Sequence, residues 1–166
     1  YDWWGFIAAD EMPQAFDPGT GYLANANNRV IGPEYPHFIA REWAAPYRAL
    51  RIEEVLDAQK KHGMNDSRAL QMDTLSLAAQ EMVSVLLHET PPTTETADVL
   101  QRLANWDKVM SRDAPEPLIF TAWLEEIGRT LFADELGTDY ARFARGHPML
   151  IRQVLSDDRD WCDDTS

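Results

Sequence analysis

The segment LIFTAWLEEIGRTLFADEL, residues 118–136, indicates most clearly how this chain folds. Its apolar side chains recur at intervals of three and four residues, which places them on one side of an α-helix. These side chains are Leu118, Ile119, Phe120, Trp123, Leu124, Ile127, Leu131 and Phe132. We therefore predict a long helix over residues 118–136 whose apolar side packs into a core.

Most of the chain around this segment has the same helical periodicity. From Phe38 onward, apolar residues at helical spacing alternate with glycine, proline and capping residues, which end one helix and begin the next. The expected helices cover about residues 46–61, 65–88, 96–110, 139–145 and 148–155. The sequence therefore predicts a mainly α fold, with a helical, bundle-like domain over residues 37–166.

Residues 1–36 differ from the rest, because turn-forming residues interrupt each apolar run. This segment holds four of the ten prolines. Two apolar pieces, residues 3–8 and 22–26, are separated by Pro13 and by the turn sequence Asp17-Pro18-Gly19. We predict two short strands or extended segments joined by a loop, so that residues 1–36 form a short β or extended domain.

The composition limits the classes of partner. The 166 residues are enough for one domain with a sizeable core. The chain has 28 acidic and 15 basic residues, and the formal net charge of -13 argues against nucleic acid or an anionic membrane as a partner. No apolar run approaches the length of a membrane span. The single cysteine, Cys162, lies among five aspartates, and we expect an unreactive thiol because negative neighbours disfavour the thiolate.

Residues 21–30, GYLANANNRV, are the strongest candidate for chemistry. A polar cluster after an apolar run can present oriented amide donors. An asparagine carboxamide is one donor that stabilises the negative oxygen formed during acyl transfer. On a strand, Asn25 and Asn27 would point to one face and Asn28 to the other. The alternative is turn chemistry, in which these side chains cap backbone groups.

These residues also carry a resemblance to a known family. The stretches that carry it are GYLANANNRV at 21–30, YDWWGFI at 1–7, DPGTG at 17–21 and GPEYP at 32–36. They resemble the middle of a penicillin acylase β chain, and the resemblance continues to at least Arg48 and more weakly through the helices. It implies an N-terminal nucleophile hydrolase that cleaves linear amides. The implied fold is a larger αββα assembly whose catalytic sheet would include residues 1–36.

The resemblance implies roles for three residues. Asn27 matches the asparagine whose side-chain amide forms part of the oxyanion hole. Ala26 matches a position where some members have a tryptophan that lines the acyl pocket, so we expect a roomier or differently shaped pocket. Arg48 matches an active-site arginine that organises polar groups around the nucleophile. The alternative for Arg48 is a surface helix arginine in an ion pair.

Weaker matches lie in the helical part of the chain. Residues 71–79 resemble a helix of the same family. Asn105-Trp106-Asp107 resembles its Trp-Asp-Gly turn, with Lys108 in place of the glycine. Trp123 and Trp161 also fit. We interpret these positions as packing and capping residues that take no part in the chemistry.

The resemblance also implies parts that lie outside these residues. Family members use a serine at the N-terminus of the β chain as nucleophile, with its own amino group as base. Residue 1 here is a tyrosine. We therefore expect a portion of a longer precursor, inactive alone, whose α chain and remaining β chain supply the nucleophile. The substrate would be a small-molecule amide, with penicillins, acyl-homoserine lactones and lipopeptides all open, and the implied location is periplasmic or secreted.

No metal or cofactor site is expected within these residues, although calcium is possible in the intact enzyme. One family calcium ligand would fall near residues 34–40, where the sequence assigns none. The histidines, which lack ligand spacing, are His37, His62, His88 and His147. The adjacent carboxylates Glu53-Glu54 and Glu125-Glu126 point apart on helices and suit solvated faces.

Apolar surface left by missing parts of an enzyme predicts self-association of the chain. Trp3 and Trp4 fit such an interface better than a ligand platform. The alternative function is a non-catalytic, acidic, helical protein-interaction module. Internal packing of Trp3, Trp4, Phe6 and Tyr22 would favour the module, and their exposure would favour the acylase portion.

Overall fold

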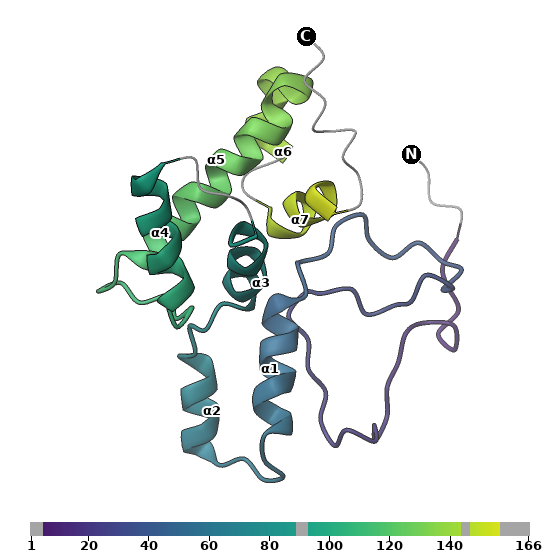
Figure 1. Cartoon of the computed structure of the whole chain (residues 1–166). Helices are drawn as coiled ribbons and strands as arrows, with labels where there is room; N and C mark the ends of the chain where they lie inside the picture. The colour runs from purple at the N-terminus through teal and green to yellow at the C-terminus, as the bar shows by residue number, and fades with distance from the viewer. Residues whose placement is uncertain (1–4, 89–92, 144–146, 157–166) are drawn as a thin grey trace. The chain divides into compact units, whose positions relative to one another are not determined.

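The computed structural model describes residues 5–88, 93–143 and 147–156 (Figure 1). By their internal contacts, the residues divide into two compact units, Tyr1–Gln71 and Met72–Ser166. The described residues are mainly helical, as the sequence predicts. The predicted boundary after residue 36 depends on membership of a larger sheet and stays a prediction.

The first unit begins with an irregular segment and ends with two helices, α1 (Tyr47–Asp57) and α2 (Met64–Gln71). Figure 1 shows the irregular segment as long purple and blue loops that lead into α1. Hydrogen bonds join parts of these loops that are distant in sequence. One example is the Tyr35 hydroxyl, which donates to the Glu11 carbonyl oxygen at 2.9 Å. Hydrogen bonds of this kind therefore hold parts of the irregular segment together.

Described residues 5–36 contain no β-strand. The strand that was one alternative for residues 22–26 therefore does not form in this chain. A strand is stable beside a partner with which it exchanges backbone hydrogen bonds, and the described residues supply none. Large apolar side chains in this segment and directly after it consequently remain exposed to solvent, including Phe16, which is 98% exposed, Leu23 and Phe38.

The second unit is a set of helices around one apolar core. Its elements are α3 (Leu77–Leu86), α4 (Thr94–Asn105), α5 (Glu116–Leu136), the 3-10 turn η1 (Gly137–Asp139), α6 (Tyr140–Phe143) and α7 (Pro148–Ser156). Helix α3 contacts α4 and α7, and α5 contacts α4, α6 and α7. The largest fully buried side chains are Phe132, Met82, Leu103, Ile151 and Val83. This arrangement confirms the predicted mainly α fold, whereas the predicted extent of the helical domain, residues 37–166, stays a prediction.

The long helix predicted over residues 118–136 is present as α5. It begins two residues earlier, where Pro117 occupies the first turn without loss of a helical hydrogen bond. Phe120, Leu124 and Phe132 are buried in the core, as the spacing predicts. Leu118 is an exception and is 74% exposed, because it lies in the first turn on the side away from the core.

Two predicted helices are wrong in extent: the helix predicted over residues 96–110 ends at Asn105, and residues 65–88 form α2 and α3 with a break between them. Asp73 accepts a hydrogen bond from the Leu75 backbone N–H at 3.0 Å, which favours a turn. Ser76 then caps the start of α3 through its side chain. Leu75 also forms an isolated antiparallel bridge with Val109. Caps and a long-range bridge therefore replace the continuous helix.

The turn after α4 is closed by a lysine with a left-handed backbone. Lys108 has a φ of 66°, a region that favours glycine. Its Nζ donates to the Leu103 carbonyl oxygen at 3.1 Å and also to that of Trp106, and it lies 5.7 Å from the Trp106 ring centroid. These contacts offset a backbone cost of about 1–2 kcal/mol. Lys108 is thus a capping residue.

The tryptophans of this unit are packing residues where they are described. Trp106 is buried, and its indole N–H donates to the Val109 carbonyl oxygen at 3.1 Å. Trp123 is half-buried against the core. Trp3, Trp4, Trp161 and Cys162 lie outside the described residues, so the predictions for them stay predictions.

We expect Lys108→Met to lower the free energy of unfolding of the second unit by about 1–3 kcal/mol, because backbone oxygens at the end of α4 lose a charged donor. Lys108→Gly removes the same donor but also relieves the left-handed backbone, so its loss should be about 1 kcal/mol smaller. Urea denaturation followed by tryptophan fluorescence measures both losses. A Lys108→Met chain as stable as the unmodified one would contradict the capping role.

We expect the isolated chain to self-associate through the exposed apolar side chains of residues 5–38. Light scattering should report a mass that rises with concentration, and the double substitution Phe16→Ser with Phe38→Ser should reduce it. Leu118→Ser is the matched control, because Leu118 is exposed but lies in the second unit. A chain that stays monomeric at all concentrations would remove this surface as an interface.

Candidate functional site

Asn27 lies in a turn over residues 25–28, and its φ of 62° is left-handed. Asparagine enters this region more readily than most residues. The strand spacing that would place Asn25 and Asn27 on one face therefore does not apply. Instead, Asn25 Oδ1 accepts from the Asn27 backbone N–H at 2.9 Å, and Asn28 Oδ1 accepts from the Ala26 backbone N–H at 3.1 Å. The side chains of Asn25 and Asn28 therefore cap backbone groups of a turn, which is the alternative interpretation of this cluster.

The backbone of Ala26 and Asn27 is fully hydrogen bonded. In addition to the two N–H groups, the Asn27 carbonyl oxygen accepts from the Ala44 N–H at 2.9 Å. The Ala26 carbonyl oxygen accepts from Arg48 Nη2 at 2.8 Å. All four backbone polar groups of these two residues have partners, so the turn is fixed without a neighbouring strand.

Arg48 also binds the side chain of Asn27. Arg48 lies in the first turn of α1, and its Nη2 donates to Asn27 Oδ1 at 2.9 Å. A guanidinium has donors and no acceptor, so the Asn27 carboxamide turns its oxygen toward Arg48 and its Nδ2 away. Among the described residues, the structure records no ion pair of Arg48 and no partner for Asn27 Nδ2.

The two neighbouring residues of the turn differ in exposure. Ala26 is 6% exposed, whereas the side chain of Asn27 is exposed. The turn therefore packs against the first unit through the Ala26 methyl group and presents the Asn27 carboxamide outward. Since little free space surrounds the Ala26 methyl group, a larger side chain at this position would need local movement.

Tyr22 ties the segment before the turn to the far end of α1. Its hydroxyl donates to Asp57 Oδ1 at 2.9 Å. Partial burial raises the pKa of Tyr22 above its usual value of 10.0, and the hydrogen bond to Asp57 and the charges of Asp57 and Glu53 raise it further. Arg48 lies at the start of α1 and Asp57 at its end, so one helix holds the segment at two points.

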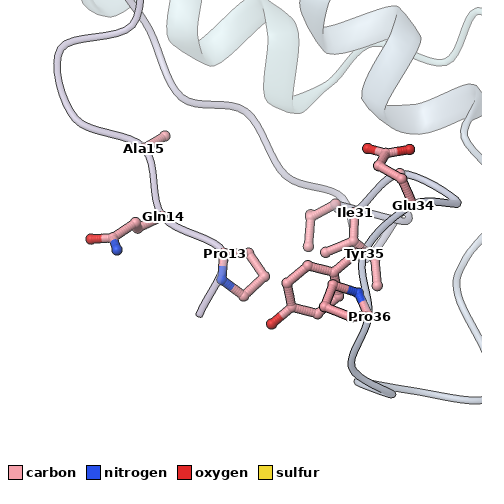
Figure 2. Close-up of a pocket in the computed structure, with 9 residues that line it drawn as sticks. Pro13, Gln14, Ala15, Ile31, Glu34, Tyr35 and Pro36 are labelled. Atoms are coloured by element: carbon pink, nitrogen blue, oxygen red, sulfur yellow. The ribbon is translucent and has the colours of Figure 1, made fainter. Parts of the chain in front are cut away.

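A surface hollow of about 630 Å³ lies in the same unit. Its lining residues are Pro13, Gln14, Ala15, Val30, Ile31, Gly32, Glu34, Tyr35 and Pro36. Figure 2 shows the ring of Tyr35 next to Pro13. Ala26, Asn27 and Arg48 do not line the hollow, so it is not built around the Asn27 carboxamide.

Metal-ligand clusters are absent from the described part of the chain: no group of three or more His, Cys, Asp or Glu residues could hold an ion there. His37 Nε2 lies 3.5 Å from Glu11 Oε2, and His62 Nε2 lies 2.9 Å from the Leu56 carbonyl oxygen. These histidines have pairwise contacts of a structural kind. Calcium in the intact enzyme stays a prediction.

The adjacent glutamates of α5 behave as solvated helix residues. Glu126 accepts from Arg129 on the next turn, and this hydrogen bond lowers the pKa of Glu126.

In the ranges that the structure describes, no helix combines the length and apolar character needed to cross a bilayer.

Comparison with known proteins decides the family. The family model described as penicillin amidase matches residues 1–166, the full length of the sequence. The chain belongs to the penicillin amidase family. The resemblance carried by residues 1–36 is thereby confirmed.

Several named acylases match most of the chain. Penicillin acylase 2 proenzyme of Pseudomonas sp. (strain SE83) is 29% identical over 137 residues, which cover 80% of this chain and 17% of that protein. Acyl-homoserine lactone acylase QuiP of Pseudomonas aeruginosa is 28% identical over 155 residues, which cover 84% and 18%. QuiP of Pseudomonas fluorescens (strain Pf0-1) is 32% identical over 153 residues, which cover 82% and 18%. The chain therefore spans less than a fifth of the length of these relatives.

We expect Tyr22 to lose its proton at a higher pH than a free tyrosine, which would appear as a late component in an alkaline ultraviolet titration. We expect Tyr22→Phe to remove that late component. The raised pKa means that the folded chain holds this proton more tightly than the unfolded chain does. The hydrogen bond between Tyr22 and Asp57 therefore contributes to stability below pH 10, and this contribution is lost as pH rises through the raised pKa of Tyr22. Asp57→Asn should shift the late component to lower pH. A late component that persists in Tyr22→Phe would show that another tyrosine is responsible.

Proposed function

We propose that this chain is a portion of an amide hydrolase of the penicillin acylase type, and that Asn27 Nδ2 donates a hydrogen bond to the oxygen that becomes negative during amide cleavage. The observation that carries the proposal is the orientation of the Asn27 carboxamide, whose oxygen is bound by Arg48. Membership of the penicillin amidase family supports the reaction class.

The chemistry of amide cleavage explains why this orientation is useful. Attack of a nucleophile on an amide carbonyl moves negative charge onto its oxygen, and donors already aimed at that oxygen lower the barrier. Asn27 Nδ2 is such a donor, because the bond from Arg48 to Oδ1 prevents the carboxamide from reversing. The positive charge of Arg48 next to Asn27 Oδ1 also polarises the Asn27 carboxamide and strengthens its Nδ2–H as a donor. Arg48 is therefore proposed as the organiser of the site.

Other parts of the precursor must complete the site. The Asn27 side chain is exposed in this chain, and an oxyanion donor acts most strongly where water is excluded. We assign the nucleophile and the remaining walls to the α chain and the rest of the β chain, in line with the small share of each relative that this chain covers. The chain alone would then have no amidase activity.

The substrate class follows from the family in part. Relatives are named penicillin acylase and acyl-homoserine lactone acylase. We propose a small-molecule amide as the substrate. Because the Ala26 methyl group packs inside the first unit in this chain, contact between Ala26 and the acyl group would need the turn to move in the intact enzyme. A periplasmic or secreted location and calcium in the intact enzyme belong to the same proposal.

We expect Asn27→Ala, introduced into the full precursor that contains this chain, to lower kcat by about 100–1000-fold with little change in KM. The reason is that Nδ2 would bind the transition state and not the ground-state amide. Hydrolysis of a chromogenic acyl anilide measures both constants. Asn65→Ala is the matched control, because Asn65 is an exposed asparagine of α2. Unchanged kcat in Asn27→Ala would remove this residue from the mechanism.

The alternative is an acidic interaction module without catalysis. The net charge of -13 and the self-contained core of the second unit favour it. The two proposals differ when the chain is mixed with the remaining chains of the precursor. Restored turnover of the anilide supports the acylase portion, whereas a stable complex without turnover supports the module.

A further inference from the structure

The hydrogen bonds of the turn leave one polar group of Ala26 and Asn27 without a recorded partner. Their two backbone N–H groups donate to Asn28 Oδ1 and Asn25 Oδ1. Their two carbonyl oxygens and Asn27 Oδ1 accept from Ala44 and Arg48. Within the described residues, Asn27 Nδ2 is the group that remains. The backbone amides of the turn therefore do not compete with it as donors.

We propose that Asn25 is a positioning residue for the proposed oxyanion donor, acting through the hydrogen bond that its Oδ1 accepts from the Asn27 backbone N–H. This inference rests on the proposed function. Asn25 fixes the left-handed backbone of Asn27, and that backbone sets the direction in which the carboxamide leaves the chain. Arg48 then fixes rotation of the carboxamide itself. Asn25 and Arg48 therefore restrain different degrees of freedom of one side chain.

Asn28 plays the matching part on the other side of the turn. Its Oδ1 holds the Ala26 N–H, and its Nδ2 donates to the Arg29 carbonyl oxygen at 3.3 Å. The oxygen of the Asn28 carboxamide and one N–H of its nitrogen are thus used inside the turn, so the turn itself fixes the orientation of Asn28. Asn25 is the better residue to test, because its bond is made to Asn27 itself.

The test is a double-mutant cycle in the full precursor. We expect Asn25→Ala to lower kcat by about 10–100-fold with little change in KM, since a small misplacement of a catalytic group has effects of this size. In the Asn27→Ala background, the same substitution should leave kcat unchanged, because no carboxamide remains to be positioned. A structural role of Asn25 would lower kcat equally in both backgrounds, and that result would overturn the proposal.

Conservative variants keep the test decisive if Asn25→Ala does not fold. Asn25→Ser retains a neutral acceptor that can reach the same backbone N–H, so it should recover a large part of kcat. Asn25→Leu retains bulk without an acceptor and should not recover kcat. Equal kcat for Asn25→Ser and Asn25→Leu would contradict the proposal.

The outcomes also separate this inference from the proposed function. If Asn27→Ala leaves kcat unchanged, the oxyanion role of Asn27 fails. If Asn27→Ala lowers kcat but Asn25→Ala and Asn25→Leu do not, the oxyanion role stands and the positioning role of Asn25 fails.

Discussion

The candidate site depends on two hydrogen bonds made by one atom, Nη2 of Arg48. They join the first turn of α1 to the Ala26 carbonyl oxygen at 2.8 Å and to Asn27 Oδ1 at 2.9 Å. Without them, the turn would lose its contact with α1 through Arg48, and the carboxamide could present either its oxygen or its nitrogen. Because an arginine side chain can only donate, the interaction selects one orientation. The donor that the proposed chemistry needs is therefore chosen by a neighbouring cation.

The two units achieve order in different ways. The second unit buries apolar side chains among its helices, and its shape follows from packing. The first unit leaves large apolar residues such as Phe16 exposed and is held by side-chain hydrogen bonds to backbone groups. A segment of this kind has few ways to shield a charge from water by itself. This is the physical reason for proposing that other parts of the precursor supply the remaining walls of the site.

Local patterns in the sequence predict the helices well where packing decides them. The apolar spacing of residues 118–136 predicts α5 to within two residues at its start. The same kind of pattern joins α2 to α3 incorrectly, because the break depends on a cap at Ser76 and a bridge from Leu75 to Val109. Residues 34 positions apart in sequence cannot be paired by periodicity. The error therefore lies where a non-local contact overrides a local preference.

The site is predictable in residue identity more than in geometry. The cluster of asparagines at 25–28 is visible in the sequence. Asn25 and Asn28 are turn residues, as one interpretation has it, and the amide-donor interpretation stays a proposal for Asn27. The alternation of a strand predicts the wrong directions for these side chains, because the backbone of Asn27 is left-handed and the Asn25 side chain binds the Asn27 backbone N–H. The pairing of Asn27 with Arg48 spans 21 residues and follows from the fold. Only the resemblance to the family brings Arg48 forward from the sequence.

The most direct measurement is a crystal structure of the full precursor that contains this chain, with a boronate adduct that mimics the tetrahedral intermediate. The account predicts that Asn27 Nδ2 lies about 2.7–3.1 Å from the adduct oxygen while Oδ1 remains bonded to Arg48. An adduct oxygen bound only by other donors, with Asn27 turned away from it, would contradict the account.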